Sequence, residues 1–378
     1  MAPDLRLRCT PAHLAAALAL RGGIGPAAAS VDLRGTGLTE PDGVLTAEAA
    51  AVLDVLLARA RVLSVVSGSP GRPEARVAVV TAPPADGPYV FEARTSEDVE
   101  LVAVTSPSTA VALLDGHLLL SALPGDGIEA ELSLPAPAWW ALLAMADAQR
   151  AAGLVADLER RSPPRGGLDR AGLDHQVAWA QRAPDARWLL GLMAVGDRAA
   201  VASVPTLLDE GVAGLEAAGL VVGEGTTVQP TGDGWAWIDL LVERVRSSHL
   251  RLIHRGDGDP TDVGSMTVVR TGTAALLAQH GVSGTTLLRT DPLLVAAIIR
   301  EVLAVPVAAV PSADRAFVGE TVTVLSPEAG SEVVGTLPAG TAVVVLDAVD
   351  GWARVHDVAE TVDGWVDEAL IVRGGSGA

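Results

Sequence analysis

The spacing of apolar residues predicts one succession of helix, strands and helix that occurs twice along the chain. In the first copy, apolar positions at helical spacing predict a helix over 47–59, and the Thr46 hydroxyl is placed to cap it. Ser106 followed by Pro107 predicts the start of a closing helix, because proline at the first helical position gives up no hydrogen bond. Between them, short β-rich runs separated by Gly, Pro and Asp predict four strands, at 62–66, 75–80, 89–93 and 99–104.

The same order of elements returns between Gly219 and Leu303. A helix is predicted over about 233–246, and Asp291-Pro292 repeats the cap ahead of a helix over 293–302. Four further strands are predicted between these helices, at 249–254, 266–271, 274–279 and 285–289. Elements that recur in register with matching caps indicate an internal duplication, and two unrelated α+β segments are the alternative.

Two stretches outside the repeat complete the predicted organisation. The run 305–311 carries two prolines and no charge, which is typical of a linker, and short strands with turns from Phe317 onward predict a small β-barrel. The predicted fold class is therefore α+β, with two pseudo-symmetric halves of helices on antiparallel sheet and a small C-terminal barrel. The predicted domains are a first half over 1–132, a helical connector over 133–185, a second half over 186–304, a linker over 305–316 and the barrel over 317–373.

Additional helices are expected at 10–20, 138–159, 169–180, 186–195 and 205–218. The last of these, with the turn that follows it, could form a winged-helix unit, but it carries acidic residues and no Arg, so a scaffold role is expected rather than DNA binding. Trp139 and Trp140 lie in an apolar helix. They are interpreted as core residues, and an exposed anchor for a partner is the alternative.

Composition narrows the possible functions. The 378 residues are 49% hydrophobic and 19% charged, which is typical of a globular protein. A net charge of −19 repels nucleic acid and anionic lipid. All basic residues are Arg, so the lysine of a P-loop or of a Schiff base is missing. No apolar run reaches the ~18 residues of a membrane span.

The sequence offers no set of reactive residues. His249 and His254 lie five apart on a predicted strand and therefore point to opposite faces, so they are not expected to share a metal. The acidic run 257–262 departs from a calcium loop, and Ser283, in Gly281-Val282-Ser283-Gly284, does not match the Gly-x-Ser-x-Gly pattern of a nucleophile elbow. Cys9 is the single cysteine. We therefore expect a non-enzymatic protein with no catalytic, cofactor or metal site.

The C-terminal segment resembles the bacterial SH3 domain. The stretches that carry the resemblance keep the family's order, and they are 334–337, 340–341, 343–346, 351–355 and 363–366. The segment departs from the family at its first strand, where Thr321-Val322-Thr323-Val324 replaces the usual Asn-Val-Arg. The resemblance implies binding of cell-wall peptide after export, with Trp352 and Trp365 as candidate contacts or as structural residues.

The duplicated part resembles the EspG family, chaperones of the type VII secretion system of actinobacteria. The pattern that carries the resemblance is Gly37-Leu38, then 42–46, then the apolar positions Val52, Leu53, Leu56 and Leu57, then the strand at Val62. The resemblance implies a cytoplasmic chaperone or adaptor that binds a helical secreted protein or hairpin pair, with the barrel as a second contact, for example to the secretion machinery. In the family a loop between the second and third strands contacts the substrate. By position, this loop gives Pro84, Asp86 and Tyr89 as candidate contacts.

The alternative function is an exported or surface-associated protein that binds cell-wall peptide through the SH3-like segment. Arg6 and Arg8 precede an apolar stretch over 12–20, which is the order of a signal peptide. His13 interrupts that stretch and Thr10-Pro11 is typical of a helix cap, so a cytoplasmic location is expected.

Overall fold

The structure is a computed structural model, and its described part divides into two compact units. The first comprises Met1–His254 with Gly264–Pro306, and the second comprises Arg255–Val263 with Val307–Ala378. Each unit is considered by itself. The described residues are 5–22, 33, 36–58, 60–83, 87–95, 97–121, 130–162, 165–224, 227–255, 261–272, 274–281, 284–304, 315–318, 322–325, 333–337, 342–349, 351–357 and 363–373.

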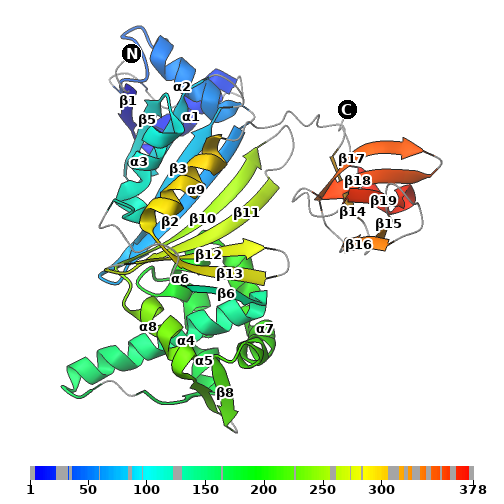
Figure 1. The fold of residues 1–378 in the computed structure, drawn as a ribbon. Helices are drawn as coiled ribbons and strands as arrows, with labels where there is room; N and C mark the ends of the chain where they lie inside the picture. Colours follow the sequence, from blue (N-terminus) through cyan, green and yellow to red (C-terminus); the bar gives the residue numbers. More distant parts are fainter. Residues whose placement is uncertain are drawn as a thin grey trace. The chain divides into compact units, whose positions relative to one another are not determined.

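A ten-stranded sheet runs through the first unit (Figure 1). Its strand order is β1-β5-β4-β3-β2-β10-β11-β12-β13-β6. The first-half strands are β1 (Leu5–Cys9), β2 (Ala60–Ser69), β3 (Arg72–Ala82), β4 (Tyr89–Arg94) and β5 (Val99–Val104). The second-half strands are β6 (Ala130–Leu134), β10 (Arg246–Arg255), β11 (Thr261–Arg270), β12 (Ala275–Gly281) and β13 (Gly284–Thr290).

The two halves of this sheet have the same strand order. Outward from the centre, where β2 neighbours β10, the first half runs β2-β3-β4-β5 and the second runs β10-β11-β12-β13. Each half also places its earliest strand beside its last strand, because β1 pairs with β5 and β6 pairs with β13, both antiparallel. The eight strands predicted from the sequence are present. The edge strands β1 and β6 were not predicted.

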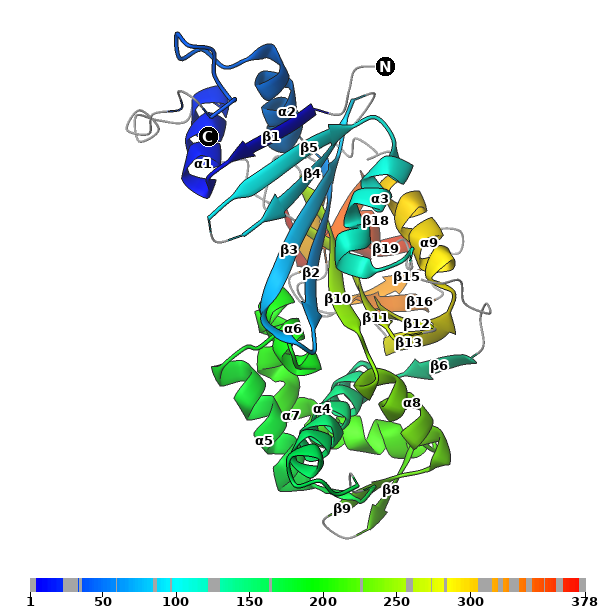
Figure 2. The same cartoon turned by 90° about the vertical axis from the view of Figure 1, so that its left-hand side faces the viewer.

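Helices cover both faces of the sheet. The bounds are α1 (Pro11–Gly22), α2 (Ala47–Leu57), α3 (Pro107–Leu118), α4 (Ala136–Leu158), α5 (Arg170–Arg182), α6 (Leu189–Gly196), α7 (Arg198–Ala217), α8 (Gly232–Val242) and α9 (Pro292–Ala304). Figure 2 shows α3 and α9 side by side on one face. No helix in the described part of the chain is long and apolar enough to span a membrane.

The packing of consecutive strand residues shows which face of the sheet each helix covers, because neighbouring side chains on a strand point to opposite faces. In the first half, Val90 packs with the residues of α1 and α2, whereas Phe91 packs with those of α3. In the second half, Leu276 packs with α4 to α8, whereas Leu277 packs with α9. We call the face of the sheet opposite α3 and α9 the outer face. Its first half carries two helices, α1 and α2, and its second half carries five, α4 to α8.

The predicted helix caps are confirmed. The Ser106 hydroxyl accepts a hydrogen bond from the Thr109 amide at 3.1 Å, and the Asp291 carboxylate accepts one from the Leu293 amide at 2.7 Å. Both caps precede a proline at the start of α3 and α9. The Thr46 hydroxyl likewise accepts from the Ala49 amide at the start of α2.

Two predicted helices differ from the structure. The helix expected to end near Arg246 ends at Val242, and Arg246 instead begins β10. The helix expected to begin at Pro205 begins at Arg198 and contains Pro205 in its interior. After it, β8 (Val221–Glu224) and β9 (Thr227–Pro230) form the expected β wing, and β7 (Leu168–Asp169) completes a three-stranded sheet.

The second unit contains a seven-stranded sheet in the order β16-β15-β19-β18-β17-β14-β20. Its buried hydrophobic residues, among those described, are Val324, Leu337, Ala353, Val355 and Val366. The described strands β16 and β20 stand at opposite ends of this order, so the predicted closed barrel is not seen among them. The bounds are β14 (Arg315–Val318), β15 (Val322–Leu325), β16 (Val333–Leu337), β17 (Ala342–Val349), β18 (Trp352–Asp357), β19 (Asp363–Asp367) and β20 (Ile371–Arg373).

Candidate functional site

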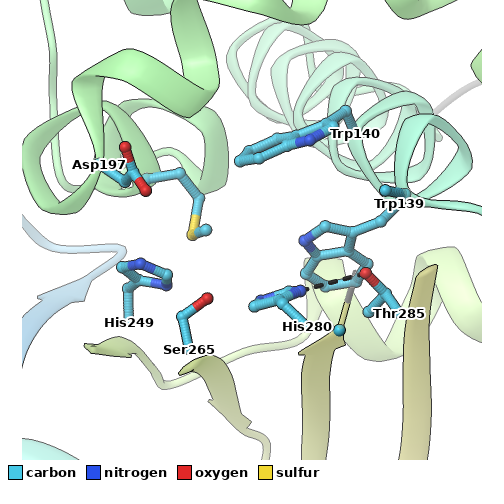
Figure 3. Close-up of a pocket in the computed structure, with 10 residues that line it drawn as sticks. Trp139, Trp140, Asp197, His249, Ser265, His280 and Thr285 are labelled. Atoms are coloured by element: carbon cyan, nitrogen blue, oxygen red, sulfur yellow. Dashed lines mark hydrogen bonds between the residues drawn. The ribbon is translucent and has the colours of Figure 1, made fainter. Parts of the chain in front are cut away.

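A pocket lies between α4, α6 and strands β10 to β13 of the first unit (Figure 3). Its cavity volume is about 140 Å³. Trp139 and Trp140 line it from α4, Met193 lines it from α6, and His249 and His280 line it from the sheet. The sequence separates these residues widely, and only the packing of α4 and α6 on one face of the second half brings them together.

The position of the tryptophans follows from the start of α4. This helix begins two residues after β6 ends, and β6 pairs with β13, so its first turns lie over the end of the sheet. Adjacent helical residues point about 100° apart. Trp139 is 1% exposed, with its ring centroid 5.7 Å from that of His280, whereas Trp140 is half-buried.

A chain of hydrogen bonds forms the sheet side of the pocket. It crosses four adjacent strands, from Thr285 on β13 through His280 and Thr267 to His249 on β10. The successive distances are 3.1 Å from Thr285 Oγ1 to His280 Nδ1, 2.9 Å from His280 Nε2 to Thr267 Oγ1 and 3.3 Å from Thr267 Oγ1 to His249 Nδ1. Thr267 also donates to the Met193 sulfur at 3.6 Å.

The imidazole of His280 is neutral at physiological pH. Burial and the neighbouring His249 lower the pKa of His280 to about 3. Both ring nitrogens bond to threonine hydroxyls, so neither is directed at Ser265, although Ser265 is its cross-strand neighbour on β11. Ser265 and His280 therefore do not form the pair of nucleophile and base that acyl transfer requires.

Asp197, the residue that follows α6, also lines the pocket. Together with His249 and His280 it could suggest a metal site. The residues that the structure describes contain no group of three or more His, Cys, Asp or Glu placed to hold an ion.

The structure separates the residues proposed from the sequence. Trp139 and Trp140 share the pocket, whereas Tyr89 begins β4 and packs half-buried on the opposite face of the sheet. Pro84 and Asp86 lie outside the described residues. In the second unit, Trp352 is 43% exposed beside Asp367, and Trp365 is half-buried beside Arg354.

Sequence reasoning missed the histidines of the pocket. The sequence pattern pairs His249 only with His254 on one strand, and it does not distinguish His280. The signal that could have identified them is the recurrence of Thr and His at inward positions of successive strands, at Thr267, His280 and Thr285. Polar residues at positions that otherwise face a core indicate a hydrogen-bonded site.

Comparison with known proteins found one family that matches part of the second unit. Residues 325–372 match the bacterial SH3 domain family. No curated protein matches the chain. Among solved structures, the chain is similar to one of the Mycobacterium tuberculosis type VII secretion system chaperone EspG5 in complex with the PE25-PPE41 dimer. That match has 12% sequence identity and a TM-score of 0.41, and it covers 79% of this chain and 96% of that chain.

Proposed function

We propose that the protein is a non-enzymatic binding protein that acts in the cytoplasm as a chaperone or adaptor for helical type VII secretion substrates. The observation that carries the proposal is the pocket of the first unit. It has aromatic walls and a neutral imidazole, and Ser265 and His280 are not arranged as nucleophile and base. Such a surface suits an apolar side chain of a partner. The EspG-like sequence pattern supports a helical secreted protein as that partner.

The proposed role also fits the charge of the chain. A helical hairpin that awaits export exposes apolar surface, and a binding protein must cover it while remaining soluble. A net charge of −19 favours solubility, and a contact area of modest size leaves the complex dissociable. In this proposal the SH3-like unit provides a second contact, such as one to the secretion machinery.

The equal strand order of the two halves supports a related proposal, that an internal duplication produced them. The domain boundaries expected from the sequence, at 1–132, 133–185, 186–304, 305–316 and 317–373, belong to that proposal. Superposition of the Ser106-Pro107 and Asp291-Pro292 corners in an experimental structure tests it. Corners that fall at non-equivalent places would contradict the duplication.

Co-expression with the small helical proteins encoded beside the gene, followed by co-purification, tests the function. We expect at least one of them to co-elute. The variant Trp140→Ala should reduce its recovery at least tenfold, because buried aromatic anchors dominate binding interfaces. Trp235→Ala is the matched control, since Trp235 is also a half-buried tryptophan of the first unit and does not line the pocket. If none of these proteins co-elutes, the chaperone proposal is wrong.

A second candidate function rests on the SH3-like unit. Its family match and the 43% exposure of Trp352 favour binding of a cell-wall peptide by an exported or surface-associated protein. Pull-down of the full chain with isolated cell wall tests this function. Binding that Trp352→Ala abolishes and Val333→Ala preserves would support it, and Val333 is a suitable control because it is an exposed apolar residue of the same sheet.

A further inference from the structure

The pocket contains a buried hydrogen-bond donor with no partner. Trp139 is 1% exposed, and its Nε1–H donates no hydrogen bond to any of the described residues. Figure 3 shows this nitrogen on the ring edge that faces the space between Trp140 and His280. Proteins rarely leave a buried donor unpaired, because the lost hydration is not replaced. A ligand in the pocket that offers an acceptor would supply the missing bond.

The size and walls of the pocket indicate the kind of group that fits. A volume of about 140 Å³ is close to that of an engineered apolar cavity in another protein, about 150 Å³, that binds benzene. Trp139, Trp140 and His280 present aromatic rings to the cavity, and the Met193 thioether forms a further wall. Aromatic rings pack favourably against both kinds of group. One six-membered ring therefore matches the space and its lining.

The charges around the pocket restrict the kind of acceptor atom that a ligand can present to Trp139 Nε1–H. The Asp197 carboxylate lines the cavity, and the chain carries a net charge of −19, so a carboxylate ligand would be repelled. The imidazole of His280 is neutral, and hydroxyls already occupy both of its nitrogens. The acceptor for Trp139 must then be uncharged. A hydroxyl on the ring meets this condition.

We propose that this pocket binds a phenol ring, presented as a tyrosine side chain of the partner, whose oxygen accepts the hydrogen bond from Trp139 Nε1–H. The inference rests on the proposed function in one respect, since it takes the partner to be a protein. The recognition chemistry itself depends only on Trp139, its neighbours and the cavity. The proposal names a side-chain type on the partner that the binding role alone does not specify.

NMR of the tryptophan indole groups in the full chain tests the chemistry. The protein has eight tryptophans, and Trp139→Phe identifies the Trp139 signal by its disappearance. If that variant does not fold, contacts between the indole and the His280 ring identify the signal in the wild type. We expect p-cresol, the side chain of tyrosine, to shift the Trp139 indole proton downfield. Toluene, the side chain of phenylalanine, should bind about tenfold more weakly and should not cause the downfield shift that a hydrogen bond produces.

A matched variant separates the hydrogen bond from general effects of losing an indole. Trp188 also has a buried indole nitrogen without a hydrogen bond among the described residues, and it lies outside the pocket. Trp188→Phe should bind p-cresol as the wild type does, whereas Trp139→Phe should bind p-cresol and toluene equally. Equal affinities of the wild type for the two probes, or no effect of either probe on the Trp139 signal, would overturn the proposal.

A second experiment places the phenol on the partner. Each tyrosine of a co-purifying partner is replaced by phenylalanine, and one replacement should reduce binding to the wild type about tenfold without further loss in Trp139→Phe. If p-cresol binds but no helical protein co-elutes, the function is wrong and the phenol site stands. If a partner co-elutes and none of its tyrosines couples to Trp139, the function stands and the tyrosine anchor is wrong.

Discussion

Replacement of Asp147 by alanine is the perturbation for which the structure gives the clearest expected magnitude. Asp147 lies in the middle of α4 and is 1% exposed. Its two carboxylate oxygens accept hydrogen bonds from the Leu189 and Leu190 amides, each at 2.9 Å. These amides open α6, which has no side-chain cap of its own from Trp188. Asp147 therefore caps a neighbouring helix across the core.

The same carboxylate lies 3.5 Å from Arg244, whose side chain is 2% exposed. Burial raises the pKa of the Asp147 carboxyl, and Arg244 with the two amides opposes that rise. Arg244 also donates to the carbonyls of Leu241 and Arg187, so its charge is fixed in place. Removing one member of a buried ion pair typically costs about 3–5 kcal/mol, since the other charge is left uncompensated.

The loss of a helix cap adds about 1 kcal/mol. We therefore expect Asp147→Ala to lower the free energy of unfolding by about 4 kcal/mol or more. Asp147→Asn should lower it by about half as much, because the amide keeps one carbonyl acceptor for α6. Arg244→Met removes the charge that Asp147 compensates, so the double variant Asp147→Ala/Arg244→Met should be more stable than the sum of the two single losses implies.

Urea unfolding followed by tryptophan fluorescence measures these differences. Asp157→Ala is the control, since Asp157 is an exposed aspartate of the same helix, and we expect it to change stability by less than about 0.5 kcal/mol. The reasoning is refuted if Asp147→Ala costs less than about 1 kcal/mol, or if the double variant loses the full sum of the single losses.

Three further variants test other parts of the first unit. Ser106→Ala should lower the unfolding free energy by about 1 kcal/mol through loss of the α3 cap, and no loss in urea unfolding would contradict the cap. Burial is the main cause that lowers the pKa of His117 to about 4. The unfolded chain therefore binds a proton at pH 5 that the folded chain does not, and stability falls as pH falls. Between pH 7.5 and pH 5 the wild type should lose about 2 kcal/mol more than His117→Gln, and equal losses would refute the assignment. Gln181→Ala should cost about 1 kcal/mol or more by leaving the Val201 carbonyl unsatisfied, whereas unchanged stability would mean that water replaces the side chain.

The hydrogen bond from Gln181 to the Val201 carbonyl also explains why the start of α7 predicted from the sequence is wrong. Proline in a helix removes the hydrogen bond to the carbonyl four residues earlier, so Pro205 was interpreted as a first helical residue. In the structure the carbonyl concerned is that of Val201, and Gln181 Nε2 on α5 donates to it at 2.9 Å. A donor from another helix allows the helix to continue through the proline. Local sequence rules contain no information about that donor.

The parts of the fold that were predicted depend on local signals. The eight central strands have bounded apolar runs, and Ser106 and Asp291 are side-chain caps beside a proline, so each can be identified within a few residues. The edge strands β1 and β6 are short, and half of their side chains are exposed, as Arg6 and Glu131 show. Their strand conformation comes from pairing with β5 and β13, which the sequence of the strand itself does not reveal.

The pocket could be predicted only in part, for a related reason. Trp139 and Trp140 are conspicuous in the sequence, but whether they form core or a binding surface depends on what lies opposite them. His280 is placed opposite Trp139 by the register of β12 with β13, in which it pairs with Thr285. A shift of one residue would turn His280 to the other face of the sheet. Tertiary register therefore decides the site.

The helices that differ between the two halves explain why the pocket forms on one side only. The outer face of the first half is covered by α1 and α2, whose contacts with the sheet are aliphatic, as with Val90. The second half carries α4 to α8, and α6 must be held at a fixed distance from the sheet for Met193 to wall the cavity. Asp147 joins the start of α6 to α4, the helix that carries Trp139 and Trp140, since its carboxylate accepts hydrogen bonds from the first amides of α6. The buried carboxylate thus connects two helices that line the pocket, and a variant that loosens α6 from α4 should weaken p-cresol binding even where the protein remains folded.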